Sequence, residues 1–338
     1  MTNQDELVEA LSRYLTEYTG QRQPVHEFRR ISDGWESDVY AFDAPAWSPS
    51  GQVLRLYFGA QAGPTALHEY RSLELLARAG YPVPRVDLVE PDAAALGRPF
   101  LIMERVGGVS LMQRWRNPDP TVRTQAMEQF CSLLATLHGL EWAHLPGAEK
   151  VPTFAIAQQL LMWRRHLSSN PIPAFEKAMA WLEAASNEVK PQSLGVVHWD
   201  FHPDNILVSE VGRAWVIDWT QFQATDVRFD LAWTLVLLAS HQDLATAQSV
   251  RSRYAEVRGW DEAAIHEEMA FFEAAACAKR LLSVLISIQR GADALGMRPG
   301  AEAIMSRQLP RIAVVYRLWL AITALPLPDV EELLAEHL

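Results

Sequence analysis

Residues 195–219 read GVVHWDFHPDNILVSEVGRAWVIDW, and this stretch decides the fold. Two short apolar runs, residues 206–208 and 215–217, flank a turn that contains a glycine, a pattern typical of a β-hairpin. Asn205 directly precedes the first run and Asp218 directly follows the second. The start of one antiparallel strand lies beside the end of the next, roughly 5 Å away. We therefore expect the side chains of Asn205 and Asp218 to converge on one point.

An amide oxygen and a carboxylate at one point suit Mg²⁺, which keeps much of its hydration and takes its remaining ligands from substrate phosphates. Asp200 lies five residues before Asn205 on the connecting segment, where it can sit beside the metal as a base. Phosphoryl transfer requires these parts, because there the protein mainly positions groups and neutralises charge. The stretch therefore predicts a magnesium-dependent phosphoryl transfer.

The spacing His198-x-Asp200-x-x-x-x-Asn205, followed by Ile217-Asp218-Trp219, resembles the catalytic loop and metal-binding segment of the aminoglycoside phosphotransferase and choline kinase-like family. The members of this family are relatives of protein kinases. The resemblance implies an α+β, bilobal protein kinase-like fold, with a β-rich N-lobe that has one main helix and a larger, mostly helical C-lobe. It also implies that Asn205 and Asp218 hold Mg²⁺.

The resemblance further implies a small-molecule kinase, an enzyme that moves the γ-phosphoryl group of a Mg-nucleotide to a hydroxyl. Asp200 would orient or deprotonate that hydroxyl, and His198 would brace the loop. Trp199 stands where glycine is common in this family, which changes the bulk but removes no ligand. The aspartate that matches Asp230 supports the catalytic loop in the family.

The first hundred residues predict a small antiparallel sheet with one helix. Residues 39–42 and 53–57 have the length and composition of strands, and turn residues lie between them. Residues 64–79 show the helical spacing of apolar side chains, and residues 99–103 form a fully apolar strand.

After Gly107-Gly108 the pattern changes to long amphipathic helices. They are predicted at residues 126–140, 154–166, 174–188 and 267–288. We therefore expect an N-lobe at residues 1–104, which binds the nucleotide. The C-lobe at residues 105–338 would carry the catalytic loop, the metal site and the acceptor pocket.

A kinase lobe needs a cation on a strand to hold the phosphates, usually a lysine, but residues 1–104 contain no lysine. Arg55 stands at the expected place, and strand alternation puts it on the face opposite Leu54 and Leu56. Glu69 and Glu74 both border the apolar stripe of the predicted helix, and helical geometry alone does not choose between them as its partner. The family pattern around this helix selects Glu69.

The remaining nucleotide contacts are implied by the resemblance. Residues 31–40 match the family's hairpin over the phosphates, so Ser32, Gly34 and Ser37 would lie against the nucleotide. The run at residues 99–106 looks like the last strand and the interlobe hinge. Its backbone from Glu104 to Val106 would hydrogen-bond the purine of ATP or GTP, and Met103 would line the pocket.

Composition narrows the partners. The 338 residues include 30 Lys and Arg against 41 Asp and Glu, a net charge of −11, and no basic run suits a nucleic acid. A small molecule with a hydroxyl group is the expected acceptor, and the chain is expected to be a monomer or homodimer. The N-terminal residues lack the pattern of a secretory signal, no run is long enough to span a membrane, and Cys131 and Cys277 form no pair, which favours the cytoplasm.

Two other functions stay open. A kinase-like protein that binds nucleotide without transferring phosphate would keep the same motifs. A metal-dependent hydrolase would instead use the alternation of His198, Asp200, His202 and Asp204 as ligands, although Pro203 argues against a regular strand there. The bland interpretation is that these residues are turn carboxylates and a buried histidine.

Overall fold

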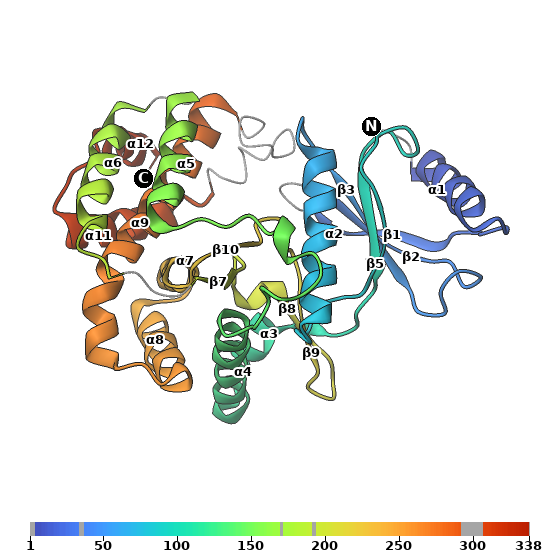
Figure 1. Cartoon of the computed structure of the whole chain (residues 1–338), viewed down its shortest axis with the longest axis horizontal. Helices are drawn as coiled ribbons and strands as arrows, with labels where there is room; N and C mark the ends of the chain where they lie inside the picture. Colours follow the sequence, from blue (N-terminus) through green and yellow to red (C-terminus); the bar gives the residue numbers. More distant parts are fainter. Residues whose placement is uncertain (1–3, 34–36, 170–171, 191–193, 292–306, 338) are drawn as a thin grey trace.

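The computed structural model describes residues 4–33, 37–169, 172–190, 194–291 and 307–337, which form two lobes (Figure 1). The N-terminal elements are α1 (Gln4–Thr19), β1 (His26–Asp33), β2 (Ser37–Asp43), β3 (Gln52–Tyr57), α2 (Ala62–Arg78), β4 (Val86–Glu90) and β5 (Phe100–Glu104). The elements that follow are β6 (Val109–Ser110), α3 (Leu111–Trp115), α4 (Pro120–His138), α5 (Ile156–Ser169), α6 (Pro173–Ser186), β7 (Leu194–Val197), β8 (Ile206–Val208), β9 (Ala214–Val216), β10 (Gln223–Asp226), α7 (Arg228–His241), α8 (Leu244–Arg258), α9 (Glu262–Arg290), α11 (Leu309–Thr323) and α12 (Pro328–His337).

The N-lobe is built on one sheet with the strand order β1-β2-β3-β5-β4, in which all neighbours are antiparallel. Strand alternation sorts the side chains of β3: Leu54 and Leu56 enter an apolar cluster on one face, and Arg55 lies on the other. Helix α2 runs between the sheet and the C-lobe (Figure 1). The predicted strands and helix of this lobe are confirmed within two or three residues of their bounds.

Helix α1 corrects the expectation of a single helix in this lobe. Its Leu7, Leu11 and Leu15 repeat every four residues, so they lie along one face. These side chains are buried in the same cluster as Leu54 and Leu56. The sheet therefore carries a helix over its outer face, whereas α2 lies at the other face.

The chain passes from β5 into the C-lobe through a glycine pair. Strand β6 pairs with β8, with Val109 opposite Val208. Gly108 has φ +146°, and a Cβ there would lie 2.4 Å from the carbonyl oxygen of Val208. Only glycine allows the two backbones to come this close at this φ. The chain can therefore enter the C-lobe sheet directly after the N-lobe sheet ends. The division into lobes at residue 104 stays a prediction.

The C-lobe is mostly helical, and the α+β, two-lobed architecture predicted from the sequence is confirmed. The four helices predicted there correspond to α4, α5, α6 and α9. Helix α7 is buried on all sides because α8, α9 and α11 pack against it. None of the helices in the described ranges combines the length and the apolar character needed to cross a bilayer.

Candidate active site

The predicted hairpin is present and ends where the sequence places the two oxygen donors. Strands β8 and β9 pair with Ile206 opposite Val216, and the Ile217 N–H donates to the carbonyl of Asn205 at 3.0 Å. Strand β9 ends at Val216, one residue earlier than expected, so Ile217 separates it from Asp218. The backbone of Asp218 has φ +69°. This left-handed conformation is uncommon for a residue with a side chain and costs about 1–3 kcal/mol. It is characteristic of sites where surrounding contacts hold a strained backbone.

A single guanidinium joins the N-lobe to this hairpin. Arg55 Nε donates to Ser37 Oγ, Nη1 to Glu69 Oε1 and Nη2 to Asp218 Oδ1, each at 2.8 Å. Burial disfavours the charge of this side chain, but Asp218 and Glu69 outweigh it and raise the pKa of Arg55 well above its ordinary value. The cation on β3 is therefore fixed by partners from β2, α2 and the hairpin.

Glu69, and not Glu74, is the partner of Arg55. Its side chain is fully buried and also accepts hydrogen bonds from Tyr57 Oη at 2.5 Å and from the Trp219 N–H at 3.1 Å. Burial raises the pKa of Glu69, although the charge of Arg55 opposes this. Glu74 instead forms a surface pair with Arg78 at 3.2 Å. Tyr57 was not predicted as a site residue, although it alternates with Arg55 on β3 and so lies on the same face of the strand.

Asp200 lies on the loop before the hairpin, with its carboxylate partly exposed. Trp233 Nε1 donates to Asp200 Oδ1 at 3.2 Å, and His202 Nε2 lies 3.5 Å from Oδ2. Asn205 Nδ2 donates to the backbone carbonyl of Asp200 at 3.0 Å. Burial would raise the pKa of Asp200, but the imidazoles of His202 and His198 hold it well below its usual range. The carboxylate is therefore ionised at neutral pH.

Asp230 holds the start of the loop that precedes the hairpin. Its buried carboxylate accepts the N–H groups of His198 and Trp199, both at 2.8 Å, and pairs with His138 Nε2 at 3.1 Å. His198 Nε2 in turn lies 2.9 Å from the carbonyl oxygen of Ile217, so this ring connects the loop to the hairpin. Nothing in the sequence pattern pointed to His138, which comes from α4.

Trp199 has φ +64°, a conformation that glycine adopts without strain. This explains physically why a glycine suits the position. The indole is buried, and its ring packs against Trp163 and Phe229 with centroid distances of 6.1 and 5.6 Å. The apolar packing of the indole and the hydrogen bond from the Trp199 N–H to Asp230 therefore hold this residue in a strained backbone conformation.

The donors at the hairpin fit a divalent cation such as Mg²⁺. Asn205 Nδ2 is used by Asp200, which leaves its Oδ1 for another partner, and Asp218 bonds Arg55 through Oδ1 while 38% of its side chain is exposed. Two protein oxygens with space for water and phosphate are what Mg²⁺ takes. In the part of the chain that the structure describes, no three His, Cys, Asp or Glu side chains are placed to hold a metal. The set of metal ligands that the hydrolase alternative requires is therefore not brought together among the described residues.

The other predicted nucleotide contacts are placed less completely. Ser32 pairs with Val39 through the backbone of β1, Met103 is buried in the core, and Gly34 lies outside the described residues. At the hinge, the N–H groups of Glu104 and Arg105 already donate to Arg85 and Gly51, each at 2.8 Å. No hydrogen bond of the Val106 N–H is recorded among the described residues, so this group is the open donor of the hinge.

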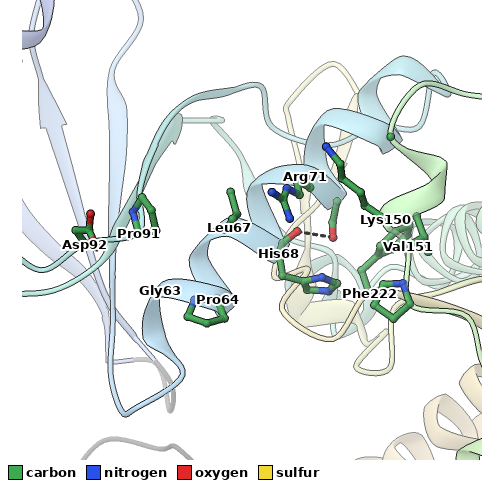
Figure 2. A pocket seen from close by; sticks show the side chains of 13 residues that line it. Gly63, Pro64, Leu67, His68, Arg71, Pro91, Asp92, Lys150, Val151 and Phe222 are labelled. Atoms are coloured by element: carbon green, nitrogen blue, oxygen red, sulfur yellow. Dashed lines mark hydrogen bonds between the residues drawn. The ribbon is translucent and has the colours of Figure 1, made fainter.

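A cavity of about 460 Å³ lies between α2 and residues 147–152 (Figure 2). Pro64, Leu67, His68 and Arg71 line it from the helix. None of its lining residues is a predicted site residue. The cavity therefore does not include the group of side chains around Arg55.

Comparisons with known proteins agree with this geometry. The profile of the phosphotransferase enzyme family matches residues 27–271. An ethanolamine kinase of Plasmodium vivax superposes with a TM-score of 0.63 at 13% identity, covering 86% of this chain and 81% of that one. An aminoglycoside-3'-phosphotransferase of type VIII gives 0.57 at 24% identity, covering 81% and 98%.

A mouse protein, acyl-CoA dehydrogenase family member 10, is 28% identical over 179 residues. The match spans 49% of this chain but only 16% of that protein.

The two lobes and the loop-and-hairpin site define a protein of the kinase-like fold. The chain belongs to the phosphotransferase enzyme family, whose profile covers well over half of its length.

Proposed function

We propose that this chain transfers the γ-phosphoryl group of Mg-ATP to a hydroxyl of a small molecule, an aminoglycoside-like antibiotic or a metabolite. The observation that carries the proposal is the connected set of polar groups around the hairpin. Asp218 bonds Arg55 at 2.8 Å, and Asn205 bonds Asp200 at 3.0 Å. The proposed base, the two oxygen ligands and the phosphate-binding cation thus come from three segments: β3, the loop before the hairpin, and the end of the hairpin after β9.

The nucleotide would lie between the lobes. Val106 offers its N–H to the purine, and Arg55 with Ser37 faces the phosphates, with GTP as the alternative nucleotide. Asn205 and Asp218 would hold Mg²⁺, which neutralises charge on the phosphates when bound. Among solved structures of the same fold, one aminoglycoside phosphotransferase was crystallised with AMP-PNP and hygromycin B, with a TM-score of 0.60 and 16% identity over 91% of this chain. That likeness supports a nucleotide and an acceptor meeting in this fold.

Asp200 would accept a hydrogen bond from the acceptor hydroxyl. Because its pKa lies well below its usual range, it is a weak base that orients the oxygen and takes the proton late in the transfer. His198 keeps the loop in place through its bond to Ile217. Trp233 fixes the rotamer of Asp200 from α7.

The test is a screen for ATP consumption across antibiotics and metabolites that carry hydroxyl groups, followed by phosphorus NMR of the product. Asp200→Asn should lower kcat roughly 10²–10⁴-fold while Mg-ATP affinity is retained, because the substitution removes a base but no ligand. Turnover close to that of the unmodified chain would refute the assignment of the base. Binding of Mg-ATP without turnover of any acceptor would instead favour the nucleotide-binding alternative.

A further inference from the structure

The cavity of about 460 Å³ beside α2 has walls from both lobes (Figure 2). One wall is the face of α2 that carries residues 63, 64, 67, 68, 71 and 72, because positions three and four apart share a face of a helix. The facing wall consists of residues 147–152 and of Phe222, which follows the β8–β9 hairpin. A cavity of this volume holds a small molecule.

The wall on the C-lobe side is one hydrogen-bonded unit. The Ala224 N–H donates to the carbonyl of Pro152 at 2.8 Å, and the Phe154 N–H donates to the carbonyl of Ala224 at 2.9 Å. Phe222 is only 2% exposed, and its ring packs against Trp219 with a centroid distance of 5.8 Å. The cavity therefore has a built wall on this side, which continues into the core.

Contacts close the cavity at both ends of α2. At the C-terminal end of the helix, Arg78 Nη1 donates to the carbonyl of Pro146 at 3.2 Å. Near the N-terminal end, Gly63 lies so close to the turn after β4 that a Cβ there would be 2.4 Å from the carbonyl oxygen of Pro91. The space between these contacts is bounded by backbone, so it does not depend on one side-chain rotamer.

The lining combines an apolar surface with two cations on facing walls. The apolar side chains are those of Pro64, Leu67, Pro91, Val151, Pro152 and Phe222.

The cations are Arg71, on α2, and Lys150, on the facing wall, and both side chains are exposed. No hydrogen bond or ion pair of either charged group is recorded among the described residues. The carboxylates nearest to them in sequence have other partners: Glu74 pairs with Arg78 at 3.2 Å, and Glu149 accepts a backbone N–H at 3.1 Å. Both cations can therefore bind an anionic occupant.

His68 and Asp92 complete the polar lining. Burial lowers the pKa of His68, the carbonyl of Phe222 opposes this, and the charge of Arg71 adds to the lowering. The imidazole is therefore a neutral group between α2 and Phe222. Asp92 lies well away from Arg71 and Lys150 (Figure 2), where it takes no part in holding an anion. Its charge favours an occupant whose anionic group lies toward the two cations.

The same helix connects the cavity to the candidate site. Glu69 follows His68 on α2, and it accepts bonds from Arg55 at 2.8 Å and from the Trp219 N–H at 3.1 Å. Trp219 in turn packs against Phe222 in the cavity wall. An occupant that touches both α2 and Phe222 makes these contacts at the separation at which Glu69 reaches Trp219. It therefore favours the arrangement in which Glu69 holds Arg55.

We propose that this cavity is a second binding site, that it takes a small organic anion with an apolar body, and that its occupation strengthens nucleotide binding through Glu69. The binding of the anion is independent of the proposed function. Its effect on the nucleotide rests on the nucleotide site of the proposed function.

The test compares probes that share one ring system and differ in charge. Calorimetry would use 2-naphthoate and 2-naphthyl phosphate as anions, 2-naphthamide as the neutral probe and 2-naphthylmethylamine as the cation, on the chain alone and loaded with Mg-AMP-PNP. At least one anion should bind about five- to tenfold more tightly than the amide and the amine, because each exposed ion pair adds only a modest gain. The carboxylate and phosphate arms tell which anion the cavity prefers.

The charge variants are Arg71→Gln and Lys150→Gln. Each should weaken binding of the preferred anion roughly three- to fivefold and leave binding of 2-naphthamide unchanged. Arg317→Gln on α11 and Lys177→Gln on α6, both at exposed positions, are the matched controls and should bind the anion as the unmodified chain does.

A filling variant locates the probe independently of charge. Leu67→Trp puts an indole into the cavity, so it should abolish binding of the anion and of the amide. Leu161→Trp, at an exposed position on α5, is its control. Urea unfolding of each variant shows whether the fold is retained.

The effect on the nucleotide is measured in the same titrations. A saturating anion should lower the Kd of Mg-AMP-PNP at least about fivefold, and Mg-AMP-PNP should strengthen anion binding by the same factor, because such coupling is reciprocal. Leu67→Trp should bind Mg-AMP-PNP without any response to the anion.

Four results would each overturn the proposal. The anions bind no more tightly than the amide, both charge variants bind the anion as the unmodified chain does, Leu67→Trp still binds it, or a saturating anion leaves the Kd of Mg-AMP-PNP unchanged. A chain that does not bind Mg-AMP-PNP at all would instead contradict the proposed function, and the anion site would still be decided by the titrations of the chain alone.

Discussion

Arg55 occupies the strand position at which a lysine was expected, and it makes more directed contacts there than a lysine could. A lysine ammonium is a point charge, whereas the planar guanidinium reaches Ser37, Glu69 and Asp218 in three fixed directions. The three contacts come from separate elements of both lobes. Arg55 therefore fixes where Asp218 sits relative to the N-lobe, in addition to the contact with a phosphate that we propose for it.

The substitution Arg55→Lys tests this view at the residue scale. One ammonium cannot replace the three directed bonds of the guanidinium, and each charge-assisted bond contributes about 1.5–3 kcal/mol. We expect KM for ATP to rise roughly 10–100-fold, measured by steady-state kinetics. Arg29→Lys, at an exposed position on the edge strand β1, is the control. An unchanged KM in Arg55→Lys would show that a point charge is sufficient.

At the scale of one element, the loop before the β8–β9 hairpin carries the proposed base, and Asp230 holds this loop through the N–H groups of His198 and Trp199. Burial would raise the pKa of Asp230, but the hydrogen bond and charge of His138, with His198, lower it below the ordinary 3.8. A carboxylate whose pKa is depressed in the folded chain stabilises the folded state at pH values above its ordinary pKa. The contribution is lost as the pH falls through the still lower pKa of the folded state.

Asp230→Asn should therefore destabilise the protein by about 2–4 kcal/mol near neutral pH, because the buried donors that face it lose an anionic acceptor. Urea unfolding at about pH 7 and about pH 3.5 would measure the difference between the variant and the unmodified chain. The difference should narrow at the lower pH. Equal stability of the two proteins at neutral pH would contradict the role given to Asp230.

Elements with local patterns were predictable from the sequence, and elements with distant partners were not. The β8–β9 hairpin is formed by two adjacent apolar runs around Gly212, so the sequence alone indicates it. Strands β7 and β10 pair across the whole hairpin, and β6 pairs with β8 over about a hundred residues of chain. No local pattern records such pairings. Helix α1 was missed although its leucines repeat every four residues.

At the scale of the whole molecule, the candidate site joins segments that no spacing relates. Arg55 and Asp218 are separated by 163 positions, and Asp200 receives its hydrogen bond from Trp233 on α7. The sequence indicated the residues of the loop and hairpin through their spacing, and only the family resemblance connected them to Arg55 and Glu69.

The stability of the molecule should also depend on pH through His241. Its pKa falls from the ordinary 6.5 to about 4 in the folded chain, so between these values the unfolded chain binds a proton that the folded chain does not. Stability is therefore lost as the pH drops through this window. Because the side chain is partly exposed, we discount the effect to about 1–2 kcal/mol.

His241→Asn should reduce this acid-induced loss, which denaturant unfolding at about pH 7 and about pH 4.5 would measure. His144→Asn, at an exposed position, is the control and should unfold with the pH dependence of the unmodified chain. The same pH dependence in His241→Asn as in the unmodified chain would show that the pKa of His241 is not lowered in the folded chain.

The most direct measurement is calorimetry of ATP binding with Mg²⁺ and with EDTA, on the unmodified chain, on Asp218→Ala and on Asp92→Ala as an exposed control. If the ends of the β8–β9 hairpin hold the metal–nucleotide unit, Mg²⁺ should strengthen ATP binding at least about tenfold in the unmodified chain and in Asp92→Ala. Asp218→Ala should show no such gain. An equal gain from Mg²⁺ in Asp218→Ala would contradict the placement of the site.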